Sequence, residues 1–193
     1  MNWVRGWNII SDYIQYEKEK EFFDRVLRHN MIKEILCVML QLSGYIVLPY
    51  GYEMTLSGLA QKFKSISKTR TGTIKRIRNS PDLLVYDAKT EQLMLVEVKV
   101  RNAPHENSVL IKKGAIEPYQ TYWKDAFFII AIPNGEIFYA QKISELDNKK
   151  EYFDATKDFK KISEVFSKIQ PQDLAYYKEI SYRILNTLYE IQH

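Results

Sequence analysis

Three charged residues lie within or at the start of apolar segments that have the pattern of buried strands. Glu97 and Lys99 lie two residues apart within the apolar run 93–100, and residues two apart in a strand project from the same face. Asp82 begins the preceding apolar run, and the polar turn 87–91 predicts a hairpin that brings Asp82 beside Glu97. Two carboxylates held close together repel each other unless a cation lies between them. The pattern therefore predicts a divalent-cation site with an ammonium group beside it.

The ligand types of this predicted site indicate which metal it would take. Carboxylate oxygens suit Mg²⁺ or Mn²⁺, whereas zinc prefers cysteine and histidine. The chain has one cysteine, Cys37, and its three histidines do not have the spacing of a zinc set. Cys37 lies in an apolar helical run, which favours a buried thiol over a nucleophile. The sequence has no glycine-rich phosphate loop that would support the use of ATP.

Helical spacing and short apolar runs predict the elements that position these residues. The run 93–100 is apolar on both faces, which predicts a central strand. In chain order we expect a first helix from Ser11–Asp12 to about Leu27, a helix over 30–42 ended by Ser43-Gly44, a strand over 45–48, hairpin strands over 82–86 and 93–100, a helix over 111–123, strands over 127–132 and 136–143, and helices over 162–169 and 174–191.

This order of elements predicts an α/β fold, a three-layer α/β/α sandwich with a central mixed sheet and extra N- and C-terminal helices. The 193 residues, 46% of them hydrophobic, are enough for one domain with a core and too few for two of full size. We expect a single domain over 1–193, with a core at about 30–143 and a helical extension over 144–193. The apolar stripe of the last helix is expected to pack on the chain's own sheet, with a dimer contact as the alternative.

Two short segments of this sequence resemble the motif of the PD-(D/E)XK nuclease superfamily. They are Ser80-Pro81-Asp82 and Glu97-Val98-Lys99. The superfamily includes restriction endonucleases, archaeal Holliday junction resolvases and several phage and viral nucleases. The order of elements over 30–132 also resembles the restriction endonuclease-like core, so the resemblance covers about half of the chain.

The resemblance implies a role for each residue of the motif. Asp82 and Glu97 would ligate Mg²⁺ or Mn²⁺, and the backbone carbonyl of Val98 would be a further ligand. Lys99 would orient or deprotonate the attacking water and stabilise the charge that builds on the phosphate. The chain would then hydrolyse phosphodiester bonds.

Two further features of the superfamily bear on this sequence. Many members place an acidic residue of the first core helix near the metal, and Glu34 is the matching candidate; a solvated surface glutamate is the alternative. Some exonuclease-like members carry a Gln-x-x-x-Tyr motif on the helix after the motif lysine. Here Gln120 is followed four residues later by Lys124, which argues against the helicase-associated exonuclease subgroup. Tyr119, Gln120 and Lys113 remain candidates to line the site.

A basic segment precedes Asp82 and is the candidate surface for nucleic acid. It contains seven basic residues and no acidic one: Lys62, Lys64, Lys68, Arg70, Lys75, Arg76 and Arg78. A solvated loop is one interpretation, and an arm that contacts phosphates without reading sequence is the other. The second interpretation favours DNA as partner, without excluding RNA, and a structure-selective enzyme such as a junction resolvase. Because such an enzyme makes two coordinated cuts, it would be a homodimer.

The rest of the composition sets the expected class and location. A single cysteine allows no internal disulfide, and the apolar runs are far too short to span a bilayer. We therefore expect a cytoplasmic or otherwise intracellular protein with no membrane partner. Two alternatives stay open besides the nuclease: a DNA-binding protein on the same fold that does not cleave, and an unrelated α/β domain in which Glu97 and Lys99 form a surface ion pair.

Overall fold

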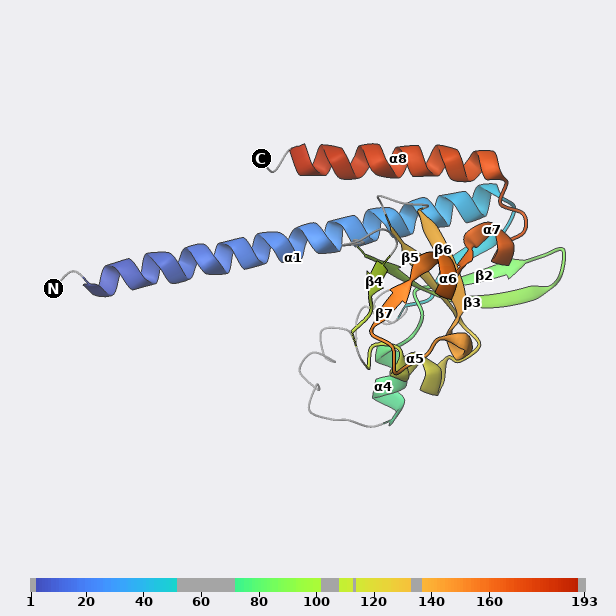
Figure 1. Cartoon of the computed structure of the whole chain (residues 1–193), viewed down its shortest axis with the longest axis horizontal. Coiled ribbons are helices and arrows are strands. Elements are labelled where there is room, and N and C mark those ends of the chain that lie inside the picture. Colours follow the sequence, from blue (N-terminus) through green and yellow to red (C-terminus); the bar gives the residue numbers. More distant parts are fainter. Residues whose placement is uncertain (1–2, 52–71, 102–107, 113, 133–136, 191–193) are drawn as a thin grey trace.

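A computed structural model describes residues 3–51, 72–101, 108–112, 114–132 and 137–190, and its centre is a six-stranded mixed sheet (Figure 1). The strands are β1 (Ile46–Pro49), β2 (Leu83–Asp87), β3 (Gln92–Val100), β5 (Phe127–Ala131), β6 (Phe138–Lys142) and β8 (Lys160–Lys161), in the spatial order β1-β2-β3-β5-β6-β8. β3 pairs antiparallel with β2 and parallel with β5, and the other neighbours are antiparallel. The predicted hairpin and the central position of its second strand are confirmed.

Helices cover one face of the sheet. They are α1 (Trp3–Leu42), α7 (Ile162–Val165) and α8 (Pro171–Glu190). The core on this face contains Leu36 and Met39 of α1, Val96 and Val98 of β3, and Phe166 after α7, all buried. Figure 1 shows α1 and α8 side by side along this face, with the N-terminal half of α1 extending beyond the sheet. The helical layer therefore rests on side chains of alternate strand residues, as burial on one face requires.

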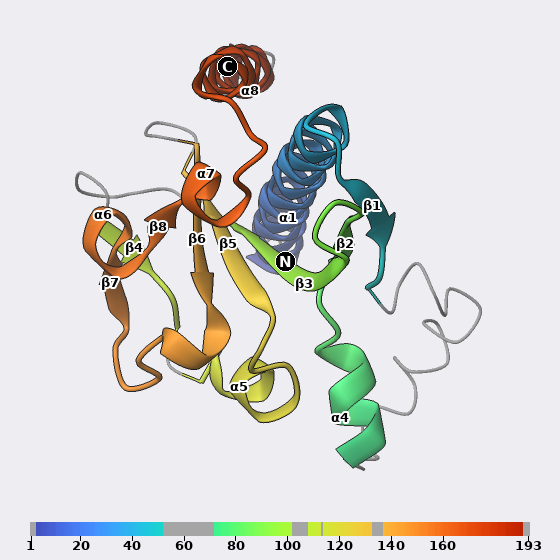
Figure 2. The ribbon, with the colours of Figure 1, turned by 90° about the vertical axis from the view of Figure 1, so that its right-hand side faces the viewer.

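A second core lies on the opposite face, under α5 (Glu117–Tyr122) and a two-stranded sheet of β4 (Ser108–Leu110) and β7 (Tyr152–Asp154). Phe128 and Ile130 of β5 contribute to this core, whereas Ile129 between them belongs to the other. The short helices α4 (Gly72–Arg78), α6 (Ala155–Asp158) and η1 (Ile143–Glu145) complete the described elements. Figure 2 shows α5 and α4 together at one end of the sheet. A mixed sheet flanked on both faces confirms the predicted fold class.

Several elements differ from those predicted. The two predicted N-terminal helices are one continuous helix, α1, which ends at Leu42 and is followed by the predicted stop at Gly44, where φ is +87°. The predicted helix 111–123 is wrong over its first half, because Ile111 and Ile116 reach the core from irregular backbone that turns at Gly114, where φ is +78°. In the basic segment, where a loop or hairpin was expected, the described part forms the helix α4.

The C-terminal quarter is more than a helical extension. Besides α7 and α8 it supplies β7, which pairs with β4, and β8, which extends the main sheet beside β6. α7 is also shorter than the predicted helix over 162–169. No helix in the described part of the chain is long and apolar enough to cross a membrane.

Candidate functional site

The three motif residues meet at the open end of the β2–β3 hairpin, away from its turn. The register pairs Leu83 with Val96, so Asp82, just before β2, lies opposite Glu97. Asp82 Oδ2 accepts a hydrogen bond of 2.9 Å from the backbone N–H of Val98. Pro81 has no N–H with which to continue the ladder toward β3, and beyond Leu83 it is the Asp82 carboxylate that accepts from the β3 backbone. This hydrogen bond fixes the carboxylate over the end of β3.

Glu97 is buried at the centre of this group, with 3% of its surface exposed. Its Oε1 accepts a hydrogen bond of 2.6 Å from the hydroxyl of Tyr119 on α5 and contacts the ammonium of Lys99. Lys99 also lies over the Tyr119 ring, 5.7 Å from its centroid. Glu97 and Lys99 therefore share a face as predicted. The side chains of Glu97 and Lys99 are only 4% and 27% exposed. They therefore do not form the surface ion pair that the alternative of an unrelated α/β domain requires.

Burial and a neighbouring carboxylate shape the chemistry of Glu97. Burial disfavours the charged form and, together with the nearby charge of Asp82, raises the Glu97 pKa to about 7; Lys99 and the Tyr119 hydroxyl oppose the rise. Burial beside Glu97 also raises the pKa of Tyr119, which keeps its proton and remains a donor. A cation is strongly stabilising where two carboxylates interact and one of them is buried.

Residues on one face of α1 also reach the site. Lys33 Nζ lies 3.9 Å from Asp82 Oδ1. His29 lies one helical turn before Lys33 and is partly buried. Burial lowers the pKa of its imidazole, and the charges of Lys99 and Lys33 lower it as well, whereas the charge of Asp82 raises it. Cys37 lies one turn after Lys33, and burial raises its pKa to about 11, so a thiolate nucleophile is not expected there. The i, i+4 spacing of these residues places them on one helix face.

Glu34, the acidic candidate on α1, is not brought into this group. Its side chain is exposed, and the residue of α1 that reaches Asp82 is Lys33. A shift of one position rotates a helical side chain by about 100°, so the exposed Glu34 corresponds to the alternative of a solvated surface glutamate. Gln120 is also directed elsewhere, because its amide donates to the carbonyls of Ile143 at 3.2 Å and Leu146 at 2.7 Å. Lys113 lies outside the described residues.

Sequence reasoning missed two cations of the site. Lys33 has a signal in the sequence, since it shares a helix face with His29 and Cys37. Arg101 is two residues beyond Lys99 and is partly buried; burial lowers its pKa and the charge of Glu97 raises it. Lys33, Lys99 and Arg101 thus surround two carboxylates. The site carries a net positive charge of about one from these side chains alone, which suits a ligand with negative charge.

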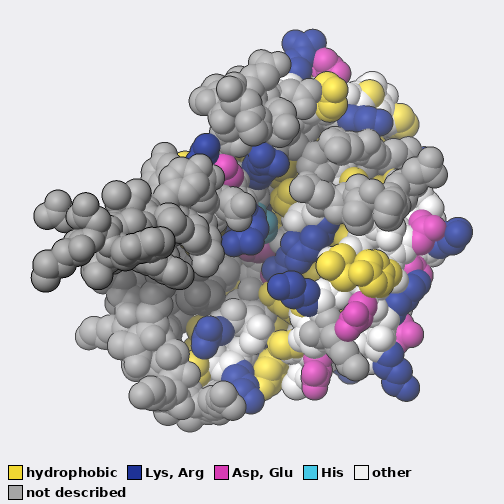
Figure 3. Space-filling view, turned by 60° about the vertical axis from the view of Figure 1, so that its left-hand side comes forward, with side chains coloured by type: hydrophobic (Ala, Val, Ile, Leu, Met, Phe, Trp, Pro, Cys, Tyr) yellow, Lys and Arg dark blue, Asp and Glu magenta, His cyan; other side chains and the backbone are white. Residues whose placement is uncertain are grey.

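The basic segment is described only in its second half. Lys62, Lys64, Lys68 and Arg70 lie outside the described residues. Lys75, Arg76 and Arg78 are on α4 and all three are exposed. The Arg76 guanidinium lies 5.0 Å from the centroid of the Trp123 ring at the end of α5, the helix that carries Tyr119. Figure 3 shows Lys and Arg side chains gathered in the middle of one face of the molecule.

The donor set can be compared with what metals require. Among the residues described, no group of three or more His, Cys, Asp and Glu side chains could hold an ion. Mg²⁺ needs no such cage, because it is commonly held by one or two carboxylates with waters and substrate phosphates as its other ligands. The N–H and the carbonyl of a strand residue point to the same side of the strand. The Val98 carbonyl therefore points, like the Val98 N–H, to the side of β3 on which β2 begins. Asp82, Glu97 and this carbonyl are the oxygen donors that an open Mg²⁺ site of this kind could use here.

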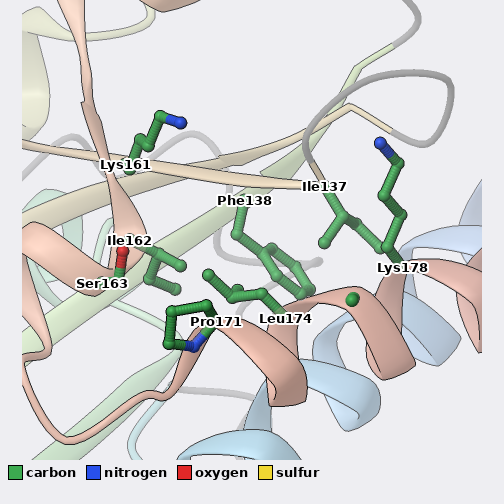
Figure 4. Close-up of a pocket in the computed structure, with 9 residues that line it drawn as sticks. Ile137, Phe138, Lys161, Ile162, Ser163, Pro171, Leu174 and Lys178 are labelled. Atoms are coloured by element: carbon green, nitrogen blue, oxygen red, sulfur yellow. The ribbon is translucent and has the colours of Figure 1, made fainter.

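A separate apolar pocket of about 450 Å³ lies on the other side of the molecule, between the sheet edge and α8 (Figure 4). Phe138, Ile162 and Leu174 are among the side chains that line it, with Lys161 and Lys178 at its margin. None of the motif residues lines this pocket. It therefore does not belong to the site around Glu97.

Comparisons with known proteins leave the function to be argued from this geometry, because no protein-family model matches the chain and no curated protein matches it significantly.

Proposed function

We propose that this protein is a Mg²⁺- or Mn²⁺-dependent nuclease of the PD-(D/E)XK kind that hydrolyses phosphodiester bonds of DNA. The observation that carries the proposal is the buried Glu97 carboxylate, which interacts with Asp82 and contacts Lys99 at the open end of one hairpin. A buried carboxylate with a raised pKa, beside a second carboxylate and a cation, is a candidate functional site because enzymes shift the pKa values of their reacting groups in this way.

The roles of the side chains follow from their positions. A bound divalent cation would act as a Lewis acid and make a coordinated water more acidic. Asp82 and Glu97 would hold it, with the Val98 carbonyl as a third donor. Lys99, in contact with Glu97, would orient the attacking water and offset the negative charge that builds on the phosphate. Tyr119 fixes the direction of the Glu97 carboxylate through its hydroxyl.

The surroundings support a polyanionic substrate. Lys33 and Arg101 add positive charge beside the two carboxylates, and α4 presents three exposed basic residues next to α5. Such contacts bind the phosphate backbone without reading its sequence. This supports selection by DNA structure, as in a junction resolvase, and for such a substrate we propose a homodimer because two strands must be cut together.

The test is cleavage of labelled linear, flapped and four-way-junction DNAs with Mg²⁺, with Mn²⁺ and with EDTA. We expect metal-dependent cutting of at least one substrate, and a loss of about 10³-fold or more in Asp82→Asn and Glu97→Gln, because each removes a metal ligand. Asp87→Asn is the matched control. Asp87 is a buried carboxylate at the other end of the same strand, and its ion pair with Lys168 at 2.6 Å is remote from the site. Absence of cutting with both metals would overturn the proposal.

A second candidate is a DNA-binding protein on this fold that does not cleave. It is favoured by the fact that each carboxylate already has a cationic neighbour, Lys33 for Asp82 and Lys99 for Glu97. In that case the wild type and Asp82→Asn would bind DNA equally, and neither would cut it. The same substrate panel, read by electrophoretic mobility as well as by cleavage, separates the two candidates.

A further inference from the structure

Three side chains, two half-buried and one exposed, form an aromatic and cationic cluster beside the proposed site. The rings of Tyr50 and Trp123 meet edge to face, with centroids 6.0 Å apart and an angle of 86°. Arg76 lies over the Trp123 ring at 5.0 Å. The three residues come from segments far apart in the chain: the end of β1, α4 and the end of α5. We call them the Tyr50–Arg76–Trp123 cluster.

Backbone hydrogen bonds tie this cluster to the proposed metal ligands. The N–H of Tyr50 donates to the carbonyl of Asp82 at 2.9 Å. The N–H of Trp123 donates to the carbonyl of Tyr119 at 2.6 Å, and the Tyr119 hydroxyl in turn donates to Glu97. The backbone of Tyr50 thus lies beside Asp82, and Trp123 follows Tyr119 by one turn of α5. The cluster and the proposed metal ligands are carried by the same segments of the chain.

The cluster differs in burial from the aromatic pairs of the core. Phe153 and Phe159, for example, are both buried. Tyr50 and Trp123 are only half-buried, and Arg76 is exposed. Core packing therefore does not account for all of their surface. Aromatic rings and guanidinium groups that retain accessible surface are the groups on which unpaired bases stack.

We propose that the Tyr50–Arg76–Trp123 cluster stacks an unpaired base, which among the structured DNAs considered above favours a single-stranded end or flap over a four-way junction as the substrate. The proposal rests on the proposed nuclease function. Bases inside a duplex have both faces covered by their neighbours, whereas an unpaired base leaves a face free to stack. Lys75 and Arg78, exposed on the same short helix as Arg76, would contact the phosphates on either side.

The competing role for these contacts is structural, since Arg76 on Trp123 also joins α4 to α5. The two roles differ in what a substitution changes. A purely structural contact would affect single-stranded and duplex DNA equally, or neither. A stacking contact would affect single-stranded DNA alone.

The experiment measures binding in EDTA, where no cleavage occurs. The probes are a labelled 12-nucleotide single strand, its duplex, and the same strand carrying 2-aminopurine, whose fluorescence falls when it stacks. We expect Trp123→Leu to weaken binding of the single strand by about tenfold and that of the duplex less than twofold. Arg76→Ala also removes a phosphate-binding charge, so it should weaken both forms but the single strand more, and both variants should abolish quenching of 2-aminopurine. Trp123→Phe keeps an aromatic ring and should retain most of the affinity. Lys178→Ala, which removes a cation at the remote pocket, should change nothing.

The outcomes separate this inference from the nuclease proposal. Equal losses for the two DNA forms, or no quenching by the wild type, would overturn the stacking proposal even if the protein cuts DNA. Quenching that depends on Arg76 and Trp123 would support it even if no substrate is cut. A thermal melt of each variant shows whether it is folded. Tighter binding of a single-stranded RNA of the same sequence would overturn DNA as the ligand.

Discussion

The Glu97 carboxylate is the residue at which burial and charge oppose each other most directly. Its pKa is raised from an ordinary value of 4.5 to about 7, so the folded protein retains a proton that the unfolded chain has lost. The stability that the protonated Glu97 carboxyl contributes is fully present below about pH 4.5, and it is lost as the pH rises to about 7. Without a divalent metal we expect this to cost roughly 3 kcal/mol of unfolding free energy over that range.

The difference between the wild type and Glu97→Gln isolates this effect from the rest of the protein, because the carboxylates remote from the site titrate alike in both. Urea unfolding at a series of pH values in EDTA should show the wild type losing stability relative to the variant between about pH 4.5 and 7. Mg²⁺ should remove much of the difference, because it stabilises the charged carboxylate. Parallel profiles for the two proteins would contradict the assigned environment of Glu97.

Tyr119 is the residue that orients Glu97 without touching the proposed metal. Tyr119→Phe removes the hydrogen bond to Oε1. Because that bond favours the charged carboxylate, its loss should raise the Glu97 pKa further above 7 and weaken Mg²⁺ binding by about 10–100-fold. Calorimetric titration at pH 6, 7 and 8 should show the largest loss at the lowest pH.

Tyr45→Phe is the matched control for Tyr119→Phe. Tyr45 is also buried, and its hydroxyl oxygen accepts a bond of 3.3 Å from the Lys168 N–H, remote from the site. Its substitution should affect stability but not the affinity for Mg²⁺. Equal metal affinity in the wild type and Tyr119→Phe would show that the hydroxyl does not position the carboxylate.

Among the elements, the end of α1 depends on one backbone conformation. Gly44 has φ +87°, its N–H donates to the carbonyl of Gln41, and the N–H of Tyr45 donates to that of Leu40; this is the glycine-ended helix stop known as the Schellman motif. A Cβ at Gly44 would meet only Lys168 Cδ at 4.0 Å, so the cost is conformational rather than steric. Gly44→Ala should destabilise the protein by about 1–2 kcal/mol.

Gly72 offers the comparison within the same chain. It lies at the start of α4, its φ is not positive, and nothing lies within 4 Å of a Cβ built there. Gly72→Ala should leave stability unchanged or raise it by up to about 1 kcal/mol. Chemical denaturation measures both variants, and an equal loss in the two would rule out the helix stop as the cause.

The elements also show what sequence patterns can and cannot predict. The hairpin that carries Asp82 and Glu97 was predictable, because two long apolar runs joined by a polar turn are a local signal. The strands β4, β7 and β8 were not, since two or three residues carry too little pattern, and their pairing is set by the core they cover. The Tyr119–Glu97 contact joins residues 22 positions apart through the packing of α5, which no local pattern encodes. Lys33 rather than Glu34 faces the site because a helix turns by about 100° per residue.

Across the whole molecule, the distribution of charge is more informative about DNA binding than the net charge. The net charge is only +4, from 28 basic and 24 acidic residues, yet α4 carries three exposed cations and no acidic residue. It lies beside α5 and the proposed site, whereas α8 lies along the opposite side (Figure 1). Cations that contact phosphates release counterions when DNA binds. The salt dependence of binding therefore reports where the DNA lies.

The affinity for DNA should fall steeply with salt, and the slope of log Kd against log salt concentration should drop by about one unit in each of Lys75→Gln and Arg78→Gln. Lys178→Gln removes the same charge from exposed α8 on the other side of the molecule and should leave the slope unchanged. Fluorescence anisotropy between about 50 and 200 mM salt covers the informative range. Because net charge changes equally in all three variants, a smaller slope in Lys178→Gln as well would mean that DNA responds to the overall charge. A smaller slope in the α4 variants alone would place the phosphate backbone across α4, beside the side chains proposed to cut it.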